Sequence, residues 1–182
     1  MRTSKRTQIL EAATRVVERE GVKSVTFDSV AAEAGLTKGG LLYHFASRDD
    51  LVQAIHQHLA DAWEAQIVAA AGKPADLATP EERLTAYSRV SSQSANRAEL
   101  LLMLEGSTTP ELAAPWDAVV ERWAPSLTTD DADDQVALDR FIARLAADGL
   151  WLYESLNTEP LAPELRRALA ERIAGALAPE GS

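Results

Sequence analysis

Small, polar and cationic residues gather between residues 26 and 50 and could contact a phosphate backbone. Thr37 supplies a hydroxyl at the start of an expected short helix, whose free amides attract phosphate. Lys38 adds a cation. Gly39 and Gly40 let the backbone approach a partner closely, although a glycine inside a helix costs about 1 kcal/mol relative to alanine. The candidate DNA-contacting residues are Lys5, Thr26, Thr37, Lys38, Gly39, Gly40, Leu41, Tyr43, His44 and Arg48.

A helix-turn-helix is the element that would present these side chains to DNA. It requires a small residue where two short helices approach, a glycine in the turn and an apolar residue after it. Ala31, Gly35 and Leu36 stand at that spacing, between expected helices over residues 27–34 and 38–44. The second helix would place its N-terminal residues against base edges in the major groove, while phosphate contacts set its register.

The segment 32–48, AEAGLTKGGLLYHFASR, resembles the signature of the TetR family of transcriptional regulators. The resemblance covers residues 5–60. One position departs from the usual motif, because Leu42 stands where the family commonly has tyrosine and Tyr43 follows one residue later. The resemblance implies a regulator that binds a palindromic operator as a homodimer and is released by a small molecule.

Apolar residues recur at helical spacing through most of the chain, and no segment alternates as a strand would. We therefore expect an all-α protein of about nine helices. The first would run from a Ser4 cap to Gly21 in the left-handed conformation, and a long one would follow Ser47 to about residue 70. Pro115 predicts a kink or a late start in its helix. Later helices are expected from Thr79, Asn96, Thr109, Gln135 and Pro163.

The resemblance further implies a three-helix DNA-binding domain over residues 1–47 and a helical ligand-binding and dimerisation bundle over residues 48–182. The last two long helices, 135–156 and from Pro163 on, would form the dimer interface as a four-helix arrangement. The apolar stripe of the final helix comprises Leu165, Leu169, Ile173 and Leu177. The alternative is that both helices face only the core of their own subunit.

Four tryptophans lie outside the expected DNA-binding domain and indicate an aromatic ligand cavity. With an acidic residue nearby, such a cavity suits planar lipophilic cations. The body resembles multidrug-sensing members of the family, which implies an efflux transporter gene as target. A plain core role for each tryptophan is the alternative. The candidate ligand-binding residues are Trp63, Leu100, Met103, Leu104, Trp116, Trp123, Asp148 and Trp151.

Charge and composition limit the other classes of protein. Residues 1–48 carry a net charge of +3 and the remainder −13, which fits a DNA-facing head on an acidic body. The chain has no cysteine, and His56 and His58 are spaced for different helix faces. No phosphate loop, nucleophile elbow or dinucleotide fingerprint is present. We expect no enzymatic activity, metal or cofactor.

Two functional alternatives stay open at this stage. A regulator of the same type could sense a different metabolite, such as a fatty acyl or lactone-like ligand, or the protein could bind DNA without any ligand. We expect a cytoplasmic protein with no membrane partner, because no secretion signal is visible and no apolar run approaches the roughly 18 residues needed to cross a membrane.

Overall fold

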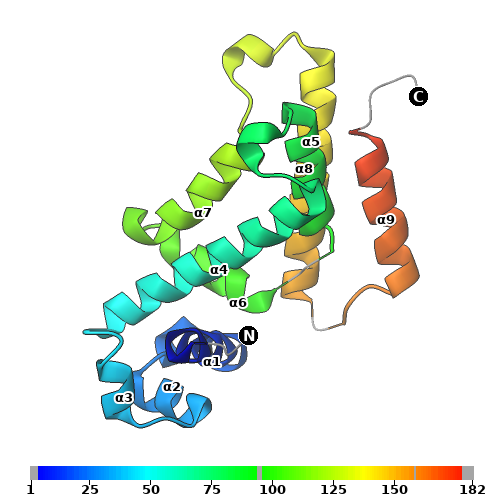
Figure 1. Cartoon of the computed structure of the whole chain (residues 1–182). Coiled ribbons are helices and arrows are strands. Elements are labelled where there is room, and N and C mark those ends of the chain that lie inside the picture. Colours follow the sequence, from blue (N-terminus) through cyan, green and yellow to red (C-terminus); the bar gives the residue numbers. More distant parts are fainter. Residues whose placement is uncertain (1–3, 94–95, 158, 178–182) are drawn as a thin grey trace. The chain divides into compact units, whose positions relative to one another are not determined.

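The computed structural model describes residues 4–93, 96–157 and 159–177. In these ranges the chain forms nine α-helices and three short 3-10 helices, with no strand (Figure 1). The all-α prediction is confirmed. The α-helices are α1 Lys5–Glu20, α2 Phe27–Ala34, α3 Lys38–Leu42, α4 Arg48–Ala71, α5 Pro80–Ser91, α6 Arg97–Gly106, α7 Pro110–Trp123, α8 Gln135–Leu156 and α9 Pro163–Gly175.

Helix starts follow side-chain caps that the sequence predicts. The Ser4 hydroxyl accepts a hydrogen bond from the Thr7 amide at 3.1 Å and begins α1. At α5, Thr79 and Glu82 form a reciprocal capping box, each accepting from the other's backbone amide. These bonds satisfy amides that lack a partner in the first turn of a helix. Each cap therefore fixes where its helix begins.

Three local details differ from expectation or decide between alternatives. Gly21 has φ 84° and ψ 167°, so its backbone is extended beyond the left-handed helical region. Helix α3 ends at Leu42 instead of residue 44, because the His44 amide donates to the carbonyl of Leu41, only three residues back. Pro115 lies inside α7, which begins at Pro110, so the late start is excluded.

The chain divides into two compact units. The first holds the described residues of Met1–Ala62 and Arg97–Asp117, and the second holds those of Trp63–Asn96 and Ala118–Ser182. Helices α4 and α7 each contribute residues to both units. This partition by contacts is a different division from the predicted functional boundary after residue 47, which stays a prediction.

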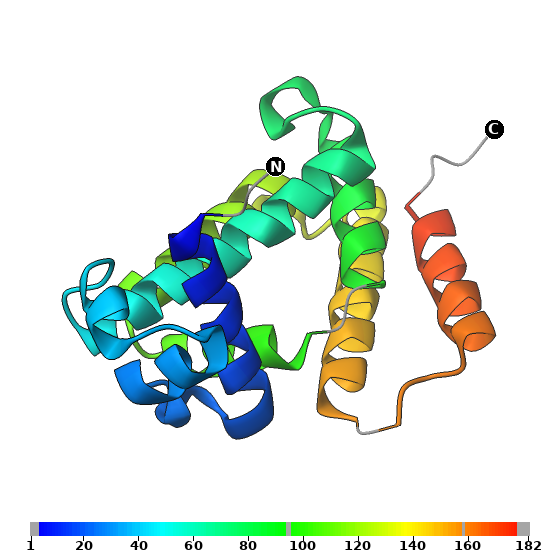
Figure 2. The same ribbon diagram turned by 60° about the horizontal axis from the view of Figure 1, so that its bottom comes forward.

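Each unit has its own helix packing. In the first, α1 packs on α2 and α6, and α2 packs on α3; Figure 2 shows α1 beside α2 in shades of blue. Its core includes the buried side chains of Ile9, Val16 and Leu51. In the second, α8 packs on α5 and on α9. Among the described helices, none is long and apolar enough to cross a membrane.

Candidate functional site

The two short helices α2 and α3 meet through the turn that the sequence predicts. Gly35 adopts the left-handed conformation, φ 65° and ψ 33°, and ends α2. Ala31 is buried, and its carbonyl accepts hydrogen bonds from the Gly35 and Leu36 amides. Only glycine adopts a left-handed backbone at little cost, so the residue type at position 35 is required by the turn. Helix α3 is thereby set across the end of α2.

The exposed face of α3 carries several of the predicted DNA-contacting residues. The Thr37 hydroxyl caps the helix by accepting from the Gly40 amide at 3.1 Å. Tyr43 is 87% exposed, and its ring meets the half-buried His44 ring edge to face at 5.2 Å. At Gly39, an added Cβ would have no neighbour within 4 Å and φ is not positive. The fold itself does not require glycine there.

One predicted contact needs correction, and a second residue has a structural role that the sequence did not predict. The Leu41 side chain is fully buried, so it belongs to the core and cannot reach DNA. Arg48 was expected to serve phosphates, but its guanidinium donates to the carbonyls of Val25, at 2.8 Å, and Val22, at 3.1 Å. These bonds tie the start of α4 to the segment before α2. Arg48 is therefore a structural anchor of the turn.

Most cations of the head have acidic partners. Arg15 and Arg19 both pair with Glu33, at 2.7 and 3.1 Å, and these bonds lower the pKa of Glu33. Lys38 pairs with Asp28 at 2.8 Å on an exposed surface. The candidates Lys5 and Thr26 are exposed, and Thr26 also caps α2. These pairs balance part of the positive charge of the head, which keeps a net charge of +3 over residues 1–48.

Half of the predicted ligand-binding residues lie in the first unit. Trp116 is buried, and its indole N–H donates to Nδ1 of His56 at 3.0 Å. His56 is fully buried, and burial lowers its pKa. Leu100 is buried, Met103 is half-buried and Leu104 is 60% exposed. No sequence pattern indicates that His56 pairs with a tryptophan, because the two residues are 60 positions apart.

The other half lie in the second unit. Trp63 meets the ring of Tyr87 at 5.5 Å, and the Tyr87 hydroxyl donates to Asp148 at 2.9 Å. Burial raises the pKa of both Tyr87 and Asp148. Trp123 is fully buried, with its indole N–H donating to Glu64, and Trp151 is half-buried. The structure thus brings Trp63 and Asp148 onto one tyrosine.

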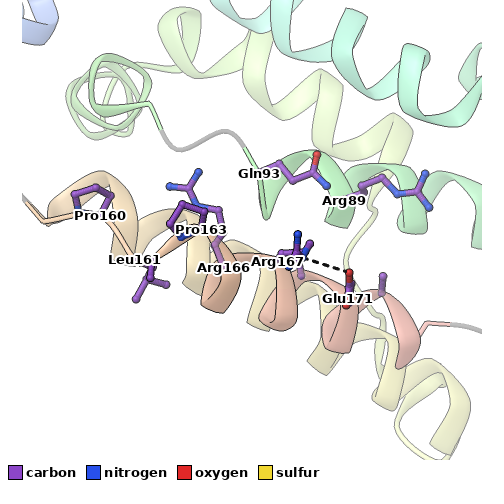
Figure 3. Close-up of a pocket in the computed structure, with 11 residues that line it drawn as sticks. Arg89, Gln93, Pro160, Leu161, Pro163, Arg166, Arg167 and Glu171 are labelled. Atoms are coloured by element: carbon purple, nitrogen blue, oxygen red, sulfur yellow. Dashed lines mark ion pairs between the residues drawn. The ribbon is translucent and has the colours of Figure 1, made fainter.

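The second unit contains two pockets of note. An open groove of about 850 Å³ runs between the C-terminal turn of α5 and α9. Figure 3 shows Arg89 and Gln93 on its α5 side and the Arg167–Glu171 ion pair on its α9 side. A smaller pocket of about 170 Å³ is lined by α5, the end of α7 and α8. We call it the arginine pocket, after its three arginines Arg83, Arg140 and Arg144.

Helix α3 is short and exposed, and it lies across the end of α2. This arrangement is that of a helix-turn-helix DNA-binding protein. The family model described as "Bacterial regulatory proteins, tetR family" matches residues 9–55. That described as "Tetracyclin repressor-like, C-terminal domain" matches residues 81–178, more than half of the chain. The chain therefore belongs to the TetR family. Its members are transcriptional regulators that bind DNA and small molecules, not enzymes.

Known proteins match the chain over most of its length. The regulator BetI of Paraburkholderia xenovorans (strain LB400) is 29% identical over 174 residues, covering 88% of this chain and 86% of BetI. The multidrug binding protein EbrR, in complex with malachite green, is 25% identical with a TM-score of 0.59 and 94% and 98% coverage. AibR, in complex with isovaleryl coenzyme A and operator DNA, shares the fold at 24% identity, with a TM-score of 0.68 and 94% and 97% coverage.

Proposed function

We propose that this TetR-family protein is a ligand-responsive repressor, which binds a palindromic operator as a homodimer through α3. The observation that carries the proposal is the exposed face of α3, where Tyr43 is 87% exposed and Gly39 has open space around it. A glycine inside a short helix, with no neighbour in the chain that requires it, fits close approach of an external partner. The ammonium group of Lys38 lies on α3 as well, next to the Gly40 amide that Thr37 caps.

The dimer interface is proposed on α8 and α9, the last two long helices, as expected from the sequence. Apolar or small residues at positions 142, 145, 149, 152 and 156 repeat with the alternating three- and four-residue spacing of one helix face. All five are exposed in the described chain. On α9, Leu165 and Leu169 are also exposed. A continuous apolar stripe of this length supports helix-to-helix packing with a second copy. Such a dimer would present two α3 helices roughly 34–36 Å apart, or a multiple of this.

The inducer is proposed to act through α4, which carries Trp63 and begins at the helix-turn-helix. Within the second unit a series of contacts leads to this tryptophan. Arg144 lies over the Tyr87 ring at 5.6 Å, and the same ring packs on Trp63 at 5.5 Å. A ligand that binds the DNA-free conformation more tightly would weaken operator binding, by a coupling of about 1–3 kcal/mol. We expect Trp63→Ala to impair induction and to leave operator affinity largely intact.

The ligand class and the target gene have separate support. EbrR is described as a multidrug binding protein, and its 25% identity supports a small hydrophobic inducer here. An efflux transporter gene as target rests on the resemblance to multidrug sensors. The four tryptophans led us to expect a cationic ligand, but the arginine pocket does not favour one. Footprinting on the DNA that flanks the gene for this chain would locate the operator.

The DNA-binding role of α3 is tested by removing single hydroxyls. We expect Tyr43→Phe to weaken binding to the footprinted operator by about fivefold or more, because a hydrogen bond to a charged phosphate is lost. Ser126→Ala is the control, since it removes an exposed hydroxyl in the other unit, outside α3 and α8. Fluorescence anisotropy on a labelled operator measures both. Equal affinities for the two variants would contradict a DNA contact by Tyr43.

A further inference from the structure

The arginine pocket contains cationic groups whose hydrogen-bonding capacity is unused. Arg144 is only 9% exposed, and its Nε and Nη1 atoms are buried with no hydrogen-bond partner in the part of the chain that the structure describes. Nε of Arg83, across the pocket on α5, is in the same state. Buried N–H groups nearly always have an acceptor, and leaving one without is costly. Each arginine therefore has at least one buried N–H group at this pocket that makes no hydrogen bond.

The pocket also carries more positive than negative charge. Arg140 pairs with Glu81, the one acidic residue among those that line the pocket, at 3.4 Å. Arg83 donates from Nη1 to the Arg122 carbonyl, which is neutral. Asp148 approaches Nε of Arg144 only to 3.5 Å and accepts a shorter bond from the Tyr87 hydroxyl. Burial raises the pKa of Asp148, and the Tyr87 hydroxyl and Arg144 oppose this shift. A cation would be repelled here.

The remaining walls are apolar and aromatic. Trp123 is fully buried at the end of α7, and Phe141 on α8 packs under the Arg144 guanidinium at 5.4 Å. Leu84 and Leu127 complete this lining. The volume of about 170 Å³ is close to that of an engineered apolar cavity of about 150 Å³ that holds one benzene ring. The pocket thus has room for about one ring, which makes it a site for a small ligand.

We infer that the arginine pocket binds a small organic carboxylate, with a single aromatic ring or a short branched chain against Trp123 and Phe141. The carboxylate would accept from the N–H groups of Arg144 and Arg83 that make no hydrogen bond, and a hydrogen bond between a guanidinium and a carboxylate is strengthened by the opposite charges. Because Arg144 also lies over Tyr87, the occupant would contact the series of residues that ends at Trp63 on α4. The inference deepens the proposed function, since it names the chemical class of the inducer.

Direct binding to the full-length protein tests the inference without DNA. Benzoate is the probe, benzamide its neutral analogue and benzyltrimethylammonium its cationic one, each titrated by calorimetry. We expect benzoate to bind at least about tenfold more tightly than either analogue, because only the anion uses the charged donors. Benzoate binding should also raise the thermal midpoint. Tighter binding of benzyltrimethylammonium, or no binding of benzoate at millimolar concentration, would overturn the inference.

Variants locate the site. Arg144→Met and Arg83→Met should each weaken benzoate binding by about tenfold or more. Arg97→Met, which removes the same charge from an exposed position in the first unit, is the control and should leave binding unchanged. If Arg144→Met fails to fold by circular dichroism, Arg83→Met carries the test. Equal binding by wild type and the folded variants would place benzoate elsewhere and refute the assignment.

Operator release separates this inference from the proposed function. Benzoate that binds through Arg144 but does not release the operator would uphold the carboxylate site and contradict its role as the inducer site. Release of the operator by malachite green, with no binding of benzoate, would uphold a ligand-responsive repressor and refute the carboxylate site. Release by benzoate in wild type, lost in Arg83→Met and kept in Arg97→Met, supports both.

Discussion

Gly39→Ala tests whether the recognition helix is shaped by DNA or by the protein fold. The variant adds one methyl group where no atom of the chain lies within 4 Å and where φ is not positive. Alanine is favoured over glycine within a helix, so the free energy of unfolding should rise by about 0.5 kcal/mol. Against DNA, a methyl group forced into a close contact costs about 1 kcal/mol per subunit. Two subunits make the operator Kd about 30-fold weaker.

Urea denaturation and fluorescence anisotropy on the footprinted operator measure the two effects of Gly39→Ala. The matched control is Gly175→Ala, because Gly175 on α9 is likewise an exposed helical glycine with no atom within 4 Å of an added Cβ. The control should not change operator affinity. If Gly39→Ala is folded and binds the operator as tightly as the wild type, the close-approach reasoning is refuted. A loss of stability would instead mean that the space around Gly39 is needed by the fold.

Three further changes test other parts of the molecule. Burial lowers the pKa of His56 below its ordinary 6.5. The free energy of unfolding should therefore fall as the pH drops below about 6.5, by at most about 1.4 kcal/mol per pH unit. Urea titrations should show that the free energy of unfolding of His56→Gln depends less on pH. Leu145→Glu should give monomers in analytical ultracentrifugation, whereas Leu77→Glu, at a 69% exposed position away from α8, should not. Arg166→Met leaves the Glu154 carboxylate, which is 2% exposed, without its partner at 2.7 Å. The free energy of unfolding should fall by about 2 kcal/mol, less than for a fully buried pair. The double variant with Glu154→Gln should recover part of this stability.

Local signals account for what the sequence predicted well. Caps such as Ser4 and Thr79 act on amides within three residues, so helix starts can be deduced without knowing the rest of the fold. The positive φ required at Gly35 likewise belongs to a single turn. Leu41 shows the limit of this reasoning. It lies among polar candidates in the sequence, and only the packing of α3 on α2 shows that it faces the core.

Long-range partners account for what the sequence could not predict. Arg48 donates to a carbonyl 23 residues away, a structural role that no local sequence pattern indicates. The arginine pocket depends on Arg83 and Arg144, which lie on different helices and share no motif. Tryptophan content indicated an aromatic cavity and, by analogy, a cation. The carboxylate proposed here rests instead on which buried N–H groups make no hydrogen bond, and this follows only from the folded arrangement.

The ion pairs of the head are consistent with a DNA-binding surface because of where they lie. Lys38 and Asp28 are 54% and 73% exposed, and exposed pairs stabilise a fold by about 0–1 kcal/mol. Lys38 can therefore exchange Asp28 for a phosphate at little cost, while the pair limits its conformations beforehand. Arg48, part-buried and bonded to two backbone carbonyls, cannot exchange so easily. In the proposed mode of DNA binding, Lys38 would contact phosphate while Arg48 holds the turn, and hydrogen-bond donors such as Tyr43 would supply further contacts.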